Sequence, residues 1–138
     1  MKKLKFAVLL ILVGMVLTAC GGQGASASEP LDGTSWELVF YRKSRVLEEV
    51  TITASFRDGQ INGSAGCNTY SGSYQVTGKQ ISFGQMMSTM MFCSEPEGVM
   101  EQEQMYLEWL MDAQSFELAD DQLMTFRSDG EALTFVLQ

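Results

Sequence analysis

The sequence predicts a mainly β fold, a small antiparallel and barrel-like, strongly curved sheet of about eight strands with one α-helix. Short segments in which apolar and polar residues alternate recur across residues 34–137, as half-buried strands require. Turn-forming pairs, Asp58-Gly59 and Asp129-Gly130 among them, stand between these segments. A single stretch, residues 96–112, instead spaces its apolar residues as a helix does.

Each predicted strand ends at a turn signal or at a break in the alternation. In the first strand, Trp36, Leu38 and Phe40 share one face. Closely spaced short strands are typical of an antiparallel barrel, and we expect the helix to cover an open side or end of it. The strands are Thr34–Tyr41, Val50–Phe56, Gln60–Ala65, Tyr70–Val76, Gln80–Phe83, Ser115–Ala119, Leu123–Arg127 and Ala132–Leu137, with Met87–Cys93 as a further candidate.

The helix is predicted over Pro96–Asp112. Ser94 and Glu97 have the spacing of a capping box, and proline is tolerated in the first turn of a helix. The acidic residues Glu101, Glu103 and Glu108 lie largely off the apolar stripe. That stripe consists of Val99, Met100, Tyr106, Leu107, Leu110 and Met111.

The N-terminus has the order of a secretory signal peptide. A basic patch at residues 2–5 precedes an apolar run, and small residues then lead to Cys20. The run from Phe6 to Cys20 is 15 residues long, which is too short for a transmembrane helix of about 20 residues. The sequence Leu17-Thr18-Ala19-Cys20 resembles the lipobox of bacterial lipoproteins, which implies cleavage after residue 19 and a lipid on Cys20. Ordinary secretion with a free Cys20 is the alternative.

Three segments follow from this interpretation. Residues 1–19 are the signal peptide, residues 20–30 are a flexible Gly- and Ser-rich linker, and residues 31–138 form one domain. The protein is then expected in the cell envelope, attached to a membrane by the lipid on Cys20 and facing away from the cytoplasm. Gly21, rather than an aspartate, follows Cys20. This favours the outer membrane in a host with two membranes, and the outer face of the cell membrane in a host with one.

Charge narrows the choice of partners. The chain after residue 19 has six basic and seventeen acidic residues, a net charge of −11. Such a surface repels phosphate groups, so we expect no nucleic-acid binding. Solubility is the simplest reason for the charge, and a basic protein partner is the alternative.

Absent residues argue against catalysis. The chain has no histidine, which excludes a Ser-His-Asp triad, a Cys-His pair and histidine-containing zinc sites. No Gly-rich phosphate-binding loop occurs. We therefore expect a protein that is not an enzyme and that uses no cofactor.

Three segments resemble the META domain family, to which the heat-inducible HslJ proteins belong. These are Leu31–Leu38, Gly63–Tyr74 and Thr89–Cys93, and the resemblance covers about residues 31–138. Phe92 departs from the family pattern, which has a small residue before Cys93. The resemblance implies a small barrel-like fold in the cell envelope, a loose link to stress tolerance and no settled activity. Its signature residues are Gly33, Thr34, Trp36, Gly63, Gly66, Cys67, Asn68, Tyr70, Gly72, Tyr74, Thr89, Met91 and Cys93.

Two of the signature residues, Cys67 and Cys93, are the remaining cysteines of the chain. Disulfides persist in exported proteins, so we expect this pair to be bonded. Two buried free thiols are the first alternative. A catalytic thiol is the last, because no base that would activate it is visible.

Two local features leave alternatives open. Asn68 follows a break in the strand pattern and is expected to adopt a left-handed conformation and to bond its own backbone; a polar contact in a ligand-facing loop is the alternative. Met86, Met87, Met90 and Met91 form a methionine cluster. We expect these side chains to fill the core, and a site for a soft metal ion such as Cu(I) is the less favoured alternative.

The sequence thus predicts a monomeric envelope lipoprotein with a binding or protective role. One alternative is a carrier with a small apolar ligand in the barrel mouth. A barrel interior filled by side chains would contradict the carrier hypothesis. The other alternative is an acidic interaction or inhibitor module that docks onto a basic protein.

Overall fold

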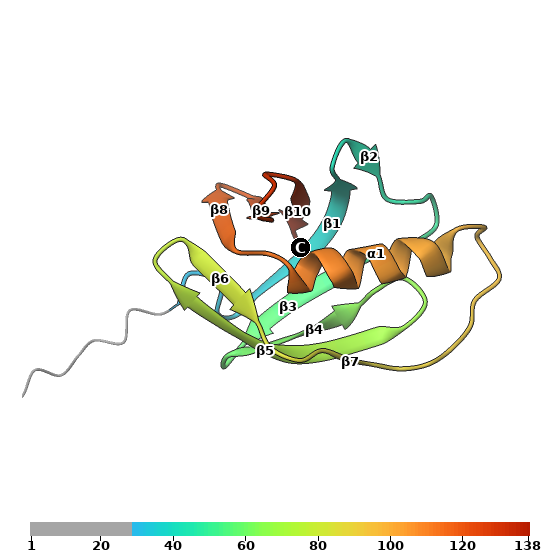
Figure 1. Ribbon diagram of the computed structural model, residues 1–138, viewed down its shortest axis with the longest axis horizontal. Helices are drawn as coiled ribbons and strands as arrows, with labels where there is room; N and C mark the ends of the chain where they lie inside the picture. The colour runs from blue at the N-terminus through green and yellow to red at the C-terminus, as the bar shows by residue number, and fades with distance from the viewer. Residues whose placement is uncertain (1–28) are drawn as a thin grey trace, which may run out of the picture.

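The computed structural model describes residues 29–138, and the predictions about the signal peptide, Cys20 and residues up to 28 concern the part of the chain outside this range. The described part has one helix and ten strands (Figure 1). They are β1 (Thr34–Tyr41), β2 (Ser44–Arg45), β3 (Thr53–Arg57), β4 (Gln60–Ser64), β5 (Thr69–Thr77), β6 (Gln80–Phe83), β7 (Met87–Ser88), α1 (Val99–Met111), β8 (Ser115–Ala119), β9 (Gln122–Phe126) and β10 (Ala132–Leu137).

Eight of the strands close into an antiparallel barrel. Their order is β1, β3, β4, β5, β6, β8, β9 and β10, and β10 pairs with β1 to complete the circle. The two short strands lie outside this ring, with β2 on β1 and β7 on β5. The predicted mainly β, barrel-like fold with one helix is therefore confirmed.

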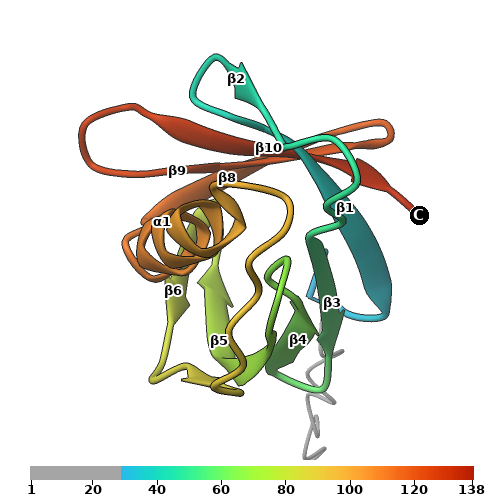
Figure 2. The same ribbon diagram turned by 90° about the vertical axis from the view of Figure 1, so that its right-hand side faces the viewer.

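The helix covers the weakest junction of the barrel. The register of β6 and β8 has the single pair Gln80 and Ser115, whereas the other neighbouring strands of the ring are paired over several residues. Figure 2 shows α1 almost end-on, between β8 and β9 on one side and β5 and β6 on the other. Tyr106 of α1 is fully buried and packs edge-on against Phe135 of β10.

Side chains from the strands and the helix fill the interior. Trp36, Phe56, Ile61 and Leu133 are each at most 2% exposed, and they belong to one core cluster with the buried face of α1. An apolar ligand inside the barrel would have to displace these packed side chains.

Two expectations about the elements are wrong, and one short strand was not predicted. The helix starts at Val99 after Gly98, whose φ is 90°, and no side chain caps its N-terminus, so Ser94 and Glu97 form no capping box. The left-handed turn at Gly98 begins the helix instead. The strand expected at Met87–Cys93 ends at Ser88, because the backbone of Met91 bonds to a side chain rather than to a neighbouring strand. The two-residue strand β2 was not predicted, since both of its residues are exposed and polar.

The buried face of α1 also differs from the predicted stripe. Val99, Tyr106 and Leu110 are buried as expected, but Met111 is 47% exposed. Polar Gln102 and Glu103 and the indole of Trp109 are buried instead. No helix within residues 29–138 has the length and hydropathy to cross a membrane.

Candidate functional site at the tip of the barrel

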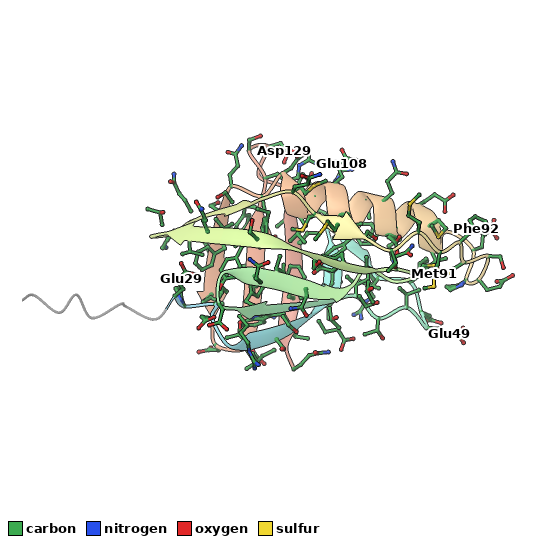
Figure 3. The ribbon with its side chains drawn as sticks, turned by 90° about the horizontal axis from the view of Figure 1, so that it is seen from below. Glu29, Glu49, Met91, Phe92, Glu108 and Asp129 are labelled. Atoms are coloured by element: carbon green, nitrogen blue, oxygen red, sulfur yellow. A yellow bond between two sulfur atoms is a disulfide. The ribbon has the colours of Figure 1, made fainter. Side chains whose placement is uncertain are left out.

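The segment between β7 and α1, residues 89–98, has no helix or strand, and we call it the tip loop. It lies at one end of the barrel, as the positions of Met91 and Phe92 show (Figure 3). Glu29, the first described residue, lies at the opposite end. A loop without backbone pairing needs other contacts to hold one shape, and the signature residues provide them.

Asn68 is the centre of these contacts. It is 2% exposed, and its side-chain oxygen accepts hydrogen bonds from the backbone N–H of Met91 (2.7 Å) and the hydroxyl of Thr89 (2.8 Å). Its side-chain nitrogen donates to the carbonyl of Met91 (3.1 Å) and to Glu103 (2.7 Å). All four hydrogen bonds of the amide are thereby made.

These contacts correct the prediction for Asn68. It is not among the described residues with positive φ, and its side chain bonds a distant loop rather than its own backbone. The left-handed conformation at this break belongs to Gly66, whose φ is 120°.

Glu103 of α1 binds the segment that contains Cys67 and Asn68. Its carboxylate is only 6% exposed, and one oxygen accepts the backbone N–H groups of Cys67 (3.0 Å) and Asn68 (2.6 Å). The other oxygen accepts the side-chain N–H of Asn68. Three donors around one carboxylate compensate for the loss of water around its charge. The expectation that Glu103 lies off the buried face of the helix is therefore wrong.

A disulfide ties the same two segments covalently. Cys67 and Cys93 are bonded, with their Cα atoms 5.9 Å apart, so the predicted pair is confirmed. Cys67 precedes Asn68, and Cys93 follows Met90, Met91 and Phe92 in the tip loop. The bond therefore holds the loop on the C-terminal side of these three exposed residues. Neither sulfur is a free thiol, which removes the catalytic thiol alternative.

A tyrosine pair supports the network from inside the barrel. The hydroxyl of Tyr70 donates to the backbone carbonyl of Thr53 (2.9 Å) and lies 2.6 Å from the hydroxyl of Tyr106. Because the carbonyl can only accept, Tyr106 must donate to Tyr70. Burial raises the pKa of both phenols far above the ordinary value, so neither is suited to act as a base.

The signature glycines lie where a side chain would collide or strain the backbone. A Cβ on Gly63 would overlap the backbone carbonyl of Thr53, the group that Tyr70 bonds. A Cβ on Gly72 would meet the sulfur of Met86. These glycines therefore permit close packing.

The remaining signature residues lie away from the tip. Gly33 has a φ of 77° in the turn before β1. The hydroxyl of Thr34 donates to the carbonyl of Leu31 and accepts from the indole of Trp36. Tyr74 packs edge-on against Phe56, with ring centres 4.9 Å apart. These residues hold the barrel wall and form no common site with Asn68.

The tip loop exposes apolar side chains to solvent. Met90 is 98% exposed, Phe92 82% and Met91 57%. Met87, in β7, is 69% exposed as well. Among the four clustered methionines only Met86 packs against the core. The expectation that the other three fill the core is wrong, because the hydrogen bonds at Met91 turn the loop outward.

Carboxylates surround this apolar tip. Glu95 and Glu97 belong to the tip loop and are exposed. Glu49 is exposed and lies at the same end as Met91 and Phe92 (Figure 3). The ion pairs within residues 29–138 join Arg42 and Arg127 to other acids, so these three carboxylates keep their charge unpaired.

Within the described residues, no three His, Cys, Asp or Glu side chains gather as metal ligands would. Glu103 was not among the predicted site residues. Its spacing was a usable signal, because Val99, Glu103, Tyr106 and Leu110 follow one another at intervals of four, three and four residues on one helix face.

A family model described as the META domain matches residues 29–138. An NMR structure of a protein from Burkholderia xenovorans is similar, with a TM-score of 0.66 and 28% identity over 78% of this chain and 83% of the other. A second NMR structure has a TM-score of 0.64 and 23% identity, covering 78% and 91% of the two chains. A DUF4847 family protein from Bacteroides vulgatus shares the fold at 13% identity, with a TM-score of 0.57 and coverage of 77% and 93%. No curated protein matches the chain.

Proposed function

The chain belongs to the META domain family, and on that premise we propose that it is a cell-envelope lipoprotein that binds a partner protein through its tip loop and catalyses no reaction. One observation carries this proposal. Met90 and Phe92 are almost wholly exposed, although the loop that bears them is held by a disulfide and by Asn68. Exposed apolar clusters on a soluble domain mark interaction surfaces.

The fixed shape of the loop favours binding. A loop that is ordered before it meets its partner loses less conformational entropy on binding. The bonds from Asn68 to both backbone groups of Met91 hold the backbone of the loop at residue 91 in one conformation. Methionine and aromatic residues are also enriched in the buried centres of interfaces.

The charge around the tip indicates the chemistry of the partner. Glu95 and Glu97 belong to the tip loop, Glu49 lies at the same end of the barrel, and all three are exposed. Protein interfaces commonly have an apolar centre and a polar rim. The complementary surface is an apolar pocket with lysine or arginine residues at its edge. A basic protein in the cell envelope is the partner that we propose.

The lipid anchor is supported by the order of the N-terminal sequence, in which a basic patch, an apolar run and Leu-Thr-Ala-Cys follow one another. An anchor on Cys20 would hold the barrel from the end at which Glu29 lies. The tip would then point away from the membrane, toward partners in the envelope. We expect the outer membrane in a host with two membranes and the outer face of the cell membrane otherwise, with a protective role under stress as the family resemblance implies.

A non-enzymatic role is supported by the residues themselves. The chain has no histidine, the two cysteines of the barrel are bonded to each other, and burial holds the paired phenols of Tyr70 and Tyr106 in their neutral form. The carrier hypothesis loses its support, because side chains fill the barrel interior.

The proposal is tested by photocrosslinking in living cells. A photoreactive phenylalanine analogue replaces Phe92 in the full chain, and a control chain carries it in place of Met111, which is 47% exposed on α1. We expect one protein to be captured at position 92 and not at position 111. The purified partner should bind the full chain at least about tenfold more weakly after Phe92→Ser, and binding should weaken with added salt.

Two results would contradict the proposal. One is equal capture at both positions, which would indicate random contact. The other is an affinity unchanged by Phe92→Ser, which would place the interface elsewhere on the barrel.

A further inference from the structure

A row of small polar side chains crosses the outer face of the barrel. In the strand register, Ser55 of β3 pairs with Asn62 of β4, Asn62 pairs with Ser71 of β5, and Ser71 pairs with Met87 of β7. Neighbouring strands lie about 4.8 Å apart. The row is therefore a regular ladder of hydroxyl and amide groups that runs perpendicular to the strands and ends at an exposed thioether.

A second row lies beside the first. Ser64 of β4 pairs with Thr69 of β5, and Thr69 is joined on its other side to Thr89 by a backbone hydrogen bond. Thr53 of β3 lies at the opposite end, where its hydroxyl accepts the backbone N–H of Ser64. The two rows together present six hydroxyl groups and one amide.

The wall is hollowed between these rows. An open groove of about 620 Å³ is lined by residues of both rows, and none of its lining residues is charged. At the groove the register of β3 and β4 ends with the pair Ser55 and Asn62, and the carbonyl of Thr53 accepts the hydroxyl of Tyr70 instead of continuing the strand pairing. Gly63 leaves the space in which this contact is made.

Three side chains of the two rows have no hydrogen-bond partner among the described residues and could bind a ligand. Within residues 29–138, no hydrogen bond occupies the side chains of Asn62, Thr69 or Ser71, whereas Ser55 bonds Ser35. Asn62 and Thr69 are exposed. Unlike the core-facing residues of the same strands, these side chains stabilise no internal contact.

From this geometry we infer that the groove binds an uncharged oligosaccharide. Hydroxyl and amide groups both donate and accept hydrogen bonds, as sugar hydroxyls do. Short side chains lose little rotamer entropy when a ligand orders them. The thioether of Met87 offers an apolar contact for the C–H groups of a sugar ring.

Other ligand classes are less suited to this surface. The groove has no basic residue for an anionic ligand and no carboxylate for a cation. A protein partner would need large apolar or arginine anchors at the centre of the contact, but Met87 stands at one end. The groove is on the wall of the barrel, and this inference does not depend on the partner proposed for the tip loop.

The test is an NMR titration of the full chain in detergent micelles. The probes are tetrasaccharides of N-acetylglucosamine, of β-linked glucose and of α-linked glucose, with a heparin-derived tetrasaccharide and a neutral extended peptide as comparisons. We expect at least one neutral sugar to shift the amide signals of Asn62, Thr69 and Ser71. The double change Asn62→Ala and Ser71→Ala should weaken that binding about tenfold or more.

Gln75→Ala is the matched control, because Gln75 is exposed on β5 outside the groove. It should leave the affinity within about twofold. The inference is overturned if no neutral sugar shifts these signals at millimolar concentration, or if the double variant binds as tightly as the control. It is also overturned if the heparin fragment or the peptide binds the groove more tightly than every neutral sugar.

Discussion

The carboxylate of Glu103 on α1 accepts two hydrogen bonds from Asn68, one from its backbone and one from its side chain. Asn68 lies 35 residues earlier, immediately before β5. Through this contact the helix, the barrel wall and the tip loop share one buried polar network. Because each member of such a network is satisfied by the others, removing one leaves several groups without partners.

Glu103→Ala is expected to lower the free energy of unfolding by about 2–4 kcal/mol, since the N–H groups of Cys67 and Asn68 and the side-chain amide of Asn68 lose their acceptor. Urea denaturation followed by circular dichroism measures this loss. Glu101→Ala is the control, because Glu101 is exposed at the start of the same helix, and it should change stability by no more than about 0.5 kcal/mol. Equal effects of the two changes would contradict the role assigned to Glu103.

The disulfide is expected to stabilise the barrel through the chain that it closes. Its cysteines are separated by 26 positions, and in the chain-entropy model a loop of this length corresponds to about 3.5 kcal/mol. The double change Cys67→Ser and Cys93→Ser should lower the denaturation midpoint accordingly.

In protein isolated from cells under non-reducing conditions, mass spectrometry should find the pair lighter than two thiols by two hydrogens. Two thiols that react with an alkylating agent would contradict the bond.

Regular strands were predictable because their signals are local. The bounds of β1, β6, β8 and β10 follow directly from alternation and from the turn residues beside them. The network around Asn68 was not predictable in this way. Its partners lie 21–36 residues distant in sequence, and a local rule for asparagine gives only the contacts that it makes with its neighbours.

The tip loop also depends on contacts between residues distant in sequence, which local patterns do not predict. The methionines there were expected to fill the core because methionine is apolar. Their outward direction depends on two hydrogen bonds between Met91 and Asn68, which no composition or periodicity reveals. The disulfide was predictable because export favours bonded cysteines and two signature positions carry them.

Alkaline pH is expected to destabilise the barrel. Burial raises the pKa of Tyr70 and Tyr106 well above the ordinary value of 10.0, and that of Tyr74 to about 12. Above pH 10 these phenols ionise in the unfolded chain and stay protonated in the folded one. Stability is therefore complete below pH 10 and falls as the pH rises beyond it.

Urea midpoints measured at increasing pH, together with the ultraviolet absorbance of tyrosinate, test this prediction. Tyr106→Phe should make the decline above pH 10 less steep, since one group with a raised pKa is gone. It should also lower stability at neutral pH through the lost hydrogen bond to Tyr70. Complete ionisation of all tyrosines near pH 10 in the folded protein would contradict the prediction.

The anchor proposed for Cys20 is tested by Cys20→Ser in the full chain. Serine has no thiol to carry the lipid, and two or three acyl chains are what hold a protein stably at a membrane. The variant should therefore carry no lipid, and it should no longer be recovered among the lipid-modified proteins of the membrane fraction. Ser26→Ala is the matched control in the linker and should remain fully membrane-bound.

Fractionation alone is ambiguous for the variant, because an uncleaved signal peptide also holds a chain at the membrane. Metabolic labelling with a fatty acid separates the two cases. The unchanged chain and Ser26→Ala should carry the label, and Cys20→Ser should carry none. Label retained by Cys20→Ser would show attachment at another residue and overturn the anchor. Absence of label from the unchanged chain would overturn it as well, since the chain would then be secreted without lipid and the orientation inferred for the tip would lose its basis.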